Sequence, residues 1–91
     1  MKKILVATGT SANRMNKAAG FIAEKCKARG IEVEIVSGNI YEVKVEEVNP
    51  DVIVLIGNNT FKTDIPIING TAFVTQIGMD QTVDQIIQKL Q

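Results

Sequence analysis

The chain has 91 residues, 45% of them hydrophobic, and its ten basic and ten acidic residues give a formal net charge of zero. This length predicts one domain over residues 1–91 with a single modest core. No apolar run approaches the roughly eighteen residues of a membrane span, and Met1, Lys2 and Lys3 lead directly into a predicted strand. We therefore expect a cytoplasmic protein without direct membrane insertion.

The rare residue types exclude further classes of protein. Cys26 is the single cysteine and histidine is absent, which argues against an internal disulfide and a structural metal, and we expect no cofactor. The chain has one tyrosine, three phenylalanines and no tryptophan, and no basic run is interleaved with them. Nucleic acid is therefore not an expected partner.

The charges are unevenly spread along the chain. Residues 1–30 hold seven basic residues and one acidic residue, a net charge of +6, whereas residues 31–60 hold one basic and six acidic residues, a net charge of −5. Lys25, Lys27 and Arg29 fit an ordinary solvated helix face. Arg14 and Lys17 differ because they fall in the first turn of a predicted helix, where a cation opposes the helix dipole unless an anion is bound. Their placement favours a phosphate-type ligand.

The first predicted elements are a buried strand, a loop of small residues and a helix. Ile4-Leu5-Val6-Ala7 form the strand, the loop starts at Thr8, and the helix covers residues 13–29 with Asn13 as its N-cap and Gly30 after its end. One helix face collects the apolar residues Met15, Ala18, Ala19, Ile22, Ala23 and Cys26. Free amides of the loop and of the first helical turn predict an anion site there.

The middle of the chain predicts two more strands. Residues 31–37 alternate apolar and acidic side chains, as in a strand near a sheet edge, and Gly38-Asn39 is expected to end it. Residues 40–49 fit either a short helix or a helical turn followed by extended chain. The most apolar run, residues 52–56, predicts a central parallel strand beside the first one.

The last third predicts an edge strand and a closing helix. Residues 65–68 form a short strand that contains Pro66, and residues 72–74 are expected to be a further extended piece. A helix over residues 80–90, with Asp80 as its N-cap, places Val83, Ile86, Ile87 and Leu90 on one face. The whole order predicts an α/β fold, a three-layer sandwich around a four-stranded parallel sheet of order 2-1-3-4 with helices on both faces.

Several phosphate-binding motifs can be tested against the loop after the first strand. Neither a nucleoside-triphosphatase loop nor a dinucleotide fingerprint occurs there, and the carboxylates of a response regulator are missing. A flavodoxin-like loop is a weak alternative, because the chain is short and poor in aromatic residues. Thr8 and Arg14 stand six residues apart, as do the cysteine and arginine of phosphatase loops, which leaves a hydrolase as a third hypothesis.

Two stretches carry a family resemblance. They are Lys3-Ile4-Leu5-Val6-Ala7-Thr8-Gly9, with the Ala18-Ala19 pair that follows, and Asp64-Ile65-Pro66-Ile67-Ile68-Asn69-Gly70, followed by Phe73-Val74-Thr75 and Gly78. Through them the chain resembles the enzyme IIB component of a bacterial phosphoenolpyruvate-dependent sugar phosphotransferase system, most closely the galactitol-type group. The resemblance covers nearly the whole chain and is weakest from Tyr41 to Phe61.

The resemblance implies a four-stranded parallel α/β fold and a phosphocarrier function. A IIB cysteine takes a phosphoryl group from a histidine of the IIA partner and passes it to a sugar bound by the membrane component IIC. Here Thr8 occupies the phosphoacceptor position. The expected phosphate-binding residues are Gly9, Thr10, Ser11, Ala12, Asn13, Arg14 and Asn16, and the loop with Asn58 and Asn59 is the expected second wall of the site.

Thr8 departs from the family pattern, and so do Arg14-Met15-Asn16, which stand where the family has Thr-Ser-Thr. A threonine hydroxyl is a weak nucleophile without a neighbouring base, and a phosphothreonine ester is a poor donor to sugar. Three accounts stay open: a natural relative that has lost the relay, an engineered replacement of the cysteine, or another route for the phosphate. The alternative function is a non-catalytic phosphate-binding or regulatory module on the same fold. Cys26 does not replace the missing cysteine, because it lies on the apolar stripe of the helix and is expected to be an ordinary core thiol.

Overall fold

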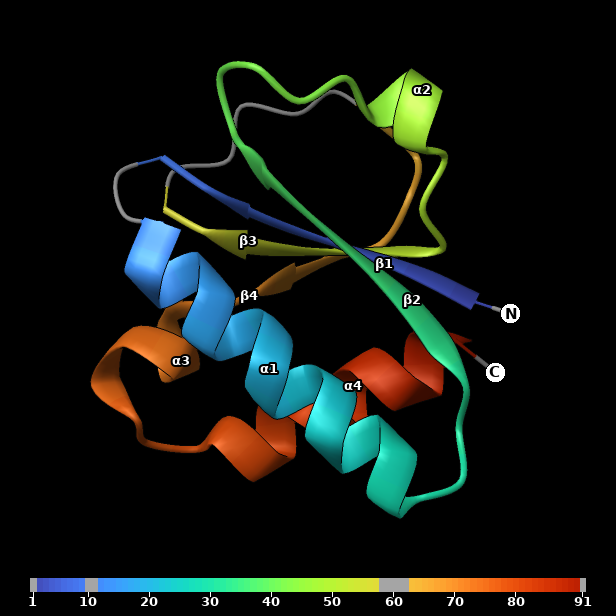
Figure 1. The fold of residues 1–91 in the computed structure, drawn as a ribbon, viewed down its shortest axis with the longest axis vertical. Helices are drawn as coiled ribbons and strands as arrows, with labels where there is room; N and C mark the ends of the chain where they lie inside the picture. Colours follow the sequence, from blue (N-terminus) through green and yellow to red (C-terminus); the bar gives the residue numbers. More distant parts are fainter. Residues whose placement is uncertain (1, 10–11, 58–62, 91) are drawn as a thin grey trace.

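The computed structural model describes residues 2–9, 12–57 and 63–90, apart from the side chains of residues 12–15. Their elements are, in chain order, β1 (Lys2–Thr8), α1 (Ala12–Ala28), β2 (Val33–Asn39), α2 (Val45–Val48), β3 (Val52–Ile56), β4 (Ile67–Asn69), α3 (Thr71–Thr75) and α4 (Met79–Leu90). The four strands are parallel and lie in the order β2-β1-β3-β4 (Figure 1). The predicted α/β fold, strand order and sheet direction are confirmed.

The two central strands are the most buried part of the sheet. Ile4 to Ala7 of β1 and Val52 to Ile53 of β3 are fully or almost fully inaccessible to solvent. Both strands lack alternation of polar and apolar residues because each of their faces is covered, as in other parallel sheets. The predicted central position of residues 52–56 beside the first strand is confirmed.

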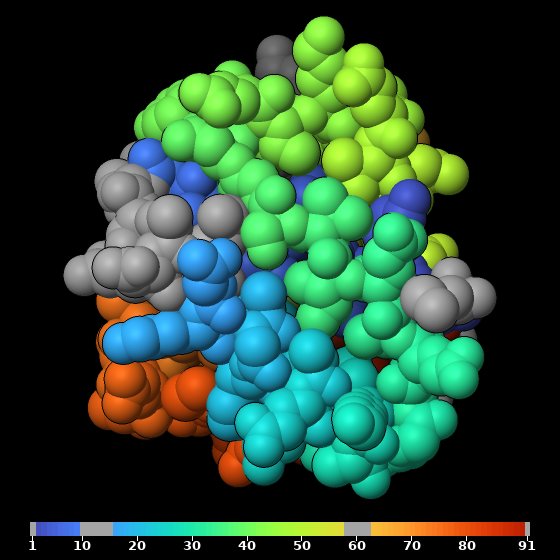
Figure 2. Space-filling model, in the orientation of Figure 1, coloured from blue at the N-terminus to red at the C-terminus, as the bar shows by residue number. Residues whose placement is uncertain are grey.

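Three helices, α1, α3 and α4, cover one face of the sheet (Figure 1). They enclose the main core, to which β1 contributes Ile4 and Val6, and α1 contributes Ala18, Ile22 and Cys26. Figure 2 shows α1 (blue to cyan) on the surface next to β2 (green). Phe21 of α1 meets Phe73 of α3 edge to face, with ring centroids 5.9 Å apart. Ala18, Ala19, Ile22 and Cys26 of the predicted apolar stripe therefore pack in the core, whereas Ala23 is exposed and the side chain of Met15 lies outside the described residues.

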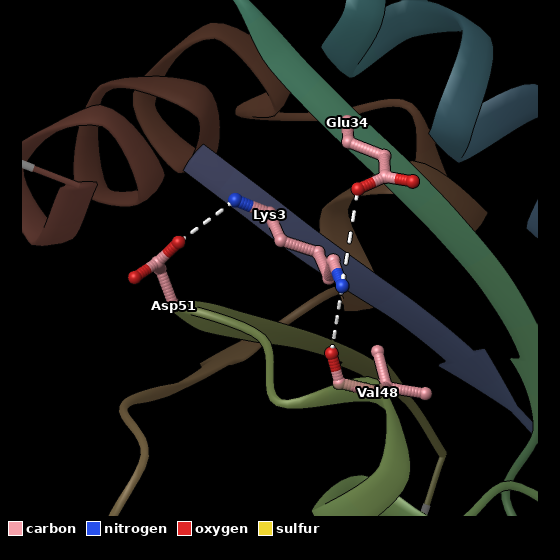
Figure 3. A network of polar contacts seen from close by, with 4 residues as sticks. All are labelled: Lys3, Glu34, Val48 and Asp51. Carbon is pink, nitrogen blue, oxygen red and sulfur yellow. Dashed lines mark hydrogen bonds and ion pairs between the residues drawn. The ribbon is translucent and has the colours of Figure 1, made fainter. Parts of the chain in front are cut away.

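The other face is covered by the segment that links β2 to β3, residues 40–50, which contains only the one-turn helix α2. Ile40 packs against Ala7 and Leu55. Lys3 fastens the end of the segment: its ammonium donates to the Val48 carbonyl at 2.9 Å and lies 3.8 Å from Glu34, while its backbone amide donates to Asp51 (Figure 3). The two faces are covered unequally, because one carries α1, α3 and α4 and the other carries only α2 and its flanking chain.

The end of α1 explains where β2 begins. Gly30 has φ +71°, the Gly30 amide donates to the Lys27 carbonyl, and the Ile31 amide donates to the Cys26 carbonyl. These two bonds form a Schellman motif, which confirms the predicted role of Gly30. Because the Ile31 amide is bound to the helix, the strand starts at Val33 instead of the predicted residue 31.

β2 also ends later than expected. Gly38 and Asn39 lie inside the strand and pair with Ala7 and Thr8, so the predicted break at this dipeptide is wrong. A Cβ built on Gly38 would lie 3.0 Å from the Val43 Cβ. The glycine therefore permits the covering segment to approach the sheet closely.

Three further predictions of local structure are wrong. Residues 72–74 are helical, because Asn69 Oδ1 accepts a hydrogen bond from the Thr71 amide and turns the chain into α3. Asp80 lies inside α4, which begins at Met79, and the Thr82 amide donates to the Gly78 carbonyl. Asn13 lies within the first turn of α1 and not before it.

Among the described residues, no helix is long and apolar enough to cross a membrane.

Candidate functional site

The carboxyl ends of the strands meet at one edge of the sheet. Thr8 at the end of β1 is paired with Asn39 of β2 and Ile56 of β3, and Asn69 of β4 is paired with Leu55 one residue earlier. α1 starts at the same edge, at Ala12 (Figure 1). Ligands of open α/β sheets bind at this edge, and the predicted site residues from Thr8 onward follow β1 there.

Thr8 is buried, with only 4% of its surface exposed. Its side chain follows Ile4 and Val6 in the alternation of β1, so it points to the face that α1 covers. Its carbonyl accepts a hydrogen bond from the Ile40 amide at 3.0 Å, but its hydroxyl has no hydrogen-bond partner in the described part of the chain. A buried hydroxyl without a partner is costly, and here it lies beside the start of a helix.

The described residues around Thr8 supply no base. Its partners across the sheet are Asn39 and Ile56, the first turn of α1 contains no acidic residue, and the sequence has no histidine. A hydroxyl needs a neighbouring base to act as a nucleophile near neutral pH. The described residues around Thr8 can therefore favour an anion, but they do not activate a nucleophile.

The start of α1 supplies donors for an anion. The first-turn amides, from Ala12 onward, have no partner within the helix, and the helix dipole places about half a positive charge there. Asn16 and Lys17 are exposed one turn further along. Thr10, Ser11, Asn58 and Asn59 lie outside the described residues, as do the side chains of Ala12, Asn13 and Arg14.

Gly9 lies against a residue that the sequence analysis did not select. A Cβ built on Gly9 would lie 3.5 Å from Cε2 of Tyr41 and 3.8 Å from its hydroxyl oxygen. Tyr41 follows the end of β2, and β1 and β2 are neighbours. An aromatic residue just after a strand that ends at the ligand-binding edge is the sequence signal that could have identified it.

The predicted second wall can be followed only as far as Gly57. This glycine follows β3 with φ +124°, in the region that favours glycine. Beside it, Leu55, Gly57, Ile67 and Asn69 line a hollow of about 240 Å³ at the same edge. Two larger surface hollows, of about 550 and 570 Å³, lie elsewhere, at the end of α1 and between α1 and the start of α4.

Cys26 is far from this edge, near the other end of α1. It is fully buried in the core, which confirms the predicted core thiol. Burial raises the pKa of the thiol above its ordinary value of 9.0, and the nearby Arg29 guanidinium partly offsets the shift. Within the described residues, no group of three or more cysteine, aspartate or glutamate side chains comes together in a way that could hold a metal ion.

Comparisons with known proteins do not place the chain in a family. Neither the scan against protein-family models nor the search of curated proteins finds a match.

Proposed function

We propose that this chain is a IIB-like component of a bacterial sugar phosphotransferase system, of the galactitol type, that binds the phosphorylated IIA donor without relaying its phosphoryl group. In this proposal the site is the loop from Thr8 to Asn16 and the start of α1. The partners are a IIA-like phosphodonor and the membrane component IIC. Binding without transfer corresponds to a phosphate-recognition or regulatory role within the system.

The observation that carries the proposal is the environment of Thr8. The residue occupies the phosphoacceptor position of the resemblance, yet no described base lies beside its hydroxyl. Attack on a phosphohistidine requires the nucleophile to lose its proton. A hydroxyl without a base does not meet this requirement, whereas anion binding by helix amides does not depend on it.

Three other features support the proposal. The parallel sheet of order β2-β1-β3-β4 agrees with the fold that the resemblance implies. The start of α1 lies at the edge where such folds bind ligands. The basic first third of the sequence suits a phosphorylated partner. The active phosphocarrier, which passes phosphate to a galactitol-like sugar on IIC, is the competing version of the same assignment.

The experiment is intact-mass measurement after incubation with phosphoenolpyruvate, the upstream phosphotransferase proteins and a galactitol-type IIA. The native chain and Thr8→Cys are compared, because a thiol at a helix start ionises more readily than a hydroxyl. We expect one added phosphate on Thr8→Cys and none on the native chain. Thr8→Cys combined with Cys26→Ala is the control, and it should retain the added phosphate.

The other outcomes separate the hypotheses. Phosphate on the native chain would show an active carrier and refute the loss of the relay. No phosphate on either protein would remove the IIB assignment and leave a phosphate-binding module outside the relay. Hydrolysis of an aryl phosphate by Thr8→Cys without any partner protein would instead favour the phosphatase hypothesis that rests on the Thr8 to Arg14 spacing.

A further inference from the structure

β2 is an edge strand of the sheet, and its outer side is open. It pairs with β1 along its whole length, and in the described part of the chain no strand pairs with its other side. Each of its seven residues is at least partly exposed, whereas the central residues of β1 are buried. Figure 2 shows β2 (green) on the surface between α1 and the segment of residues 40–50. The strand therefore presents backbone amides and carbonyls to a further strand.

The two edges of the sheet differ in their protection. The opposite edge strand, β4, has three residues and directly follows Pro66, and both a short strand and a proline hinder edge pairing. β2 has seven residues, of which three are aliphatic and none is proline or lysine. Its one charged residue, Glu34, lies 3.8 Å from the Lys3 ammonium of the neighbouring strand. The β2 edge therefore lacks the devices that keep the β4 edge from pairing.

A second copy of β2 fits this edge in an antiparallel arrangement. A two-fold axis through the middle of the strand pairs all seven residues with counterparts in the other copy: Val36 with Val36, Ile35 with Ser37, Glu34 with Gly38, and Val33 with Asn39. The acidic side chain of each strand then lies opposite a glycine, and no like charges face each other. The strand is therefore self-complementary, as a two-fold symmetric interface requires.

The helix beside the strand also suits a second copy. α1 contacts both β1 and β2 to a similar extent, which places it over the boundary between them. Because neighbouring strands are about 4.8 Å apart, pairing of the two β2 strands brings the two α1 helices to about 10 Å from each other. Packed helices are about 8 to 10 Å apart. Next to β2, the small residue Ala23 lines a hollow of about 550 Å³ with Gly30 and Val33, which leaves room for the second helix.

The face that contains the β2 edge is broad enough for a stable dimer. Figures 1 and 2 look onto this face along the shortest axis of the molecule, and the two longer dimensions are 31 and 27 Å. An interface of ordinary size buries roughly 800 Å² on each partner. The strand edge, the adjoining side of α1 and the hollow lie together on this face and can form one contact surface.

We propose that two copies of this chain associate through the β2 edge and form a continuous eight-stranded sheet, with the two α1 helices in contact on one face of it. This interface does not depend on the proposed function. Because the paired strands run in opposite directions, the two Thr8 edges lie at opposite ends of the dimer.

Sedimentation velocity of the native chain, from micromolar to millimolar concentration, measures the association. We expect a monomer–dimer equilibrium. Ser37→Lys adds a charge at an exposed position of β2, near the same charge of the second copy, and should weaken dimerisation by about tenfold or more. Gln88→Lys, an equal change of charge at an exposed position of α4, is the matched control and should leave dimerisation unchanged. Far-UV circular dichroism verifies that each variant is folded.

Cysteine variants test the register. In the proposed dimer the two Val36 Cα atoms are about 5 Å apart, within the range of a disulfide, whereas the two Ser37 Cα atoms are about 8 Å apart, beyond it. Val36→Cys should therefore give a cross-linked dimer under mild oxidation, measured as intact mass without reductant, and Ser37→Cys should give much less. The native Cys26 is fully buried and does not compete.

Each part of the test can refute the interface. A native chain that stays monomeric at millimolar concentration would overturn the proposal, and so would a dimer that Ser37→Lys leaves as tight as that of the native chain. Equal cross-linking of Val36→Cys and Ser37→Cys would refute the register that makes the strand self-complementary. These results are independent of the mass experiment on Thr8→Cys, so a failure here is distinguishable from a failure of the proposed function.

Discussion

Replacement of Thr8 by valine tests the central observation of the site. Valine has nearly the same shape as threonine but carries a methyl group in place of the hydroxyl. The Thr8 hydroxyl is buried and has no partner among the described residues. Its removal should relieve an unsatisfied polar group, which costs about 1 to 3 kcal/mol in proteins. We therefore expect Thr8→Val to raise the free energy of unfolding by about that amount.

The matching change in melting temperature follows from the size of the domain. An unfolding entropy of about 2.1 cal/mol/K per residue gives roughly 0.19 kcal/mol/K for this chain, so 1 kcal/mol corresponds to about 5 °C. Thr8→Val should thus melt about 5 to 15 °C higher than the native chain. Urea and thermal unfolding followed by far-UV circular dichroism measure both quantities, because exposed Tyr41 is a poor reporter of the core.

Thr82→Val is the matched control. Thr82 is also a buried threonine, 8% exposed, but its hydroxyl donates to the Gly78 carbonyl at 3.1 Å. Loss of that bond costs about 0.5 to 1.5 kcal/mol, so this variant should be no more stable than the native chain. If Thr8→Val were as stable as the native chain or less so, the hydroxyl would have a partner, and the argument for a buried, unpaired group at the phosphoacceptor position would fail.

The remaining predictions concern the core, two glycines and the buried thiol. Ile86→Ala should lower the free energy of unfolding, measured by urea titration, by about 2 to 5 kcal/mol because Ile86 is fully buried. Ile77→Ala, at an exposed isoleucine, should change it by less than about 0.5 kcal/mol. Equal effects of the two variants would contradict the assigned core. Gly20→Ala should stabilise the protein by about 0.5 to 1 kcal/mol, because nothing lies within 4 Å of the new Cβ and alanine favours the helix. Gly70→Ala should destabilise the protein by about 1 to 3 kcal/mol, because its Cβ would lie 2.8 Å from Ile56. Melting temperatures of the two variants that shift in the same direction would refute this pair of predictions. Because burial raises the pKa of the Cys26 thiol, the unfolded chain loses this proton at a lower pH than the folded chain. The free energy of unfolding should therefore fall as the pH rises above the ordinary thiol value of 9.0. The urea midpoints of the native chain and of Cys26→Ala should diverge with rising pH, and parallel curves would show that the thiol does not contribute.

The sequence predicts the sheet well because its strongest signals are local. Residues 52–56 are continuously apolar, and the Gly30 position after the first helix has a specific conformational role, so both predictions are confirmed. Helix or strand is harder to decide for Ala72-Phe73-Val74, because three apolar residues fit either structure. The Asn69 side chain and the contact of Phe73 with Phe21 decide in favour of a helix, and such contacts join residues far apart in the sequence.

The candidate site was predictable as a place and not as a set of contacts. A small-residue loop between a buried strand and a helix indicates, from the sequence alone, the sheet edge at which the candidate site is placed. The burial of Thr8 depends on how α1 packs over the sheet, and a local sequence pattern does not predict this packing. Tyr41 was not predicted as a neighbour of the site. Its proximity to Gly9 follows from the pairing of β1 with β2, whose paired residues lie about thirty positions apart in the sequence.

The unequal covering of the two sheet faces has a consequence for hydrogen exchange. Among the described residues, the helical side encloses a core of fourteen buried residues, whereas the buried cluster on the other side consists of Ala7, Ile40 and Leu55. We therefore expect residues 40–49 to open while the sheet and its three helices stay folded, and their amides to exchange through this local opening. Amides of the two central strands should exchange more slowly, because both faces of these strands are covered.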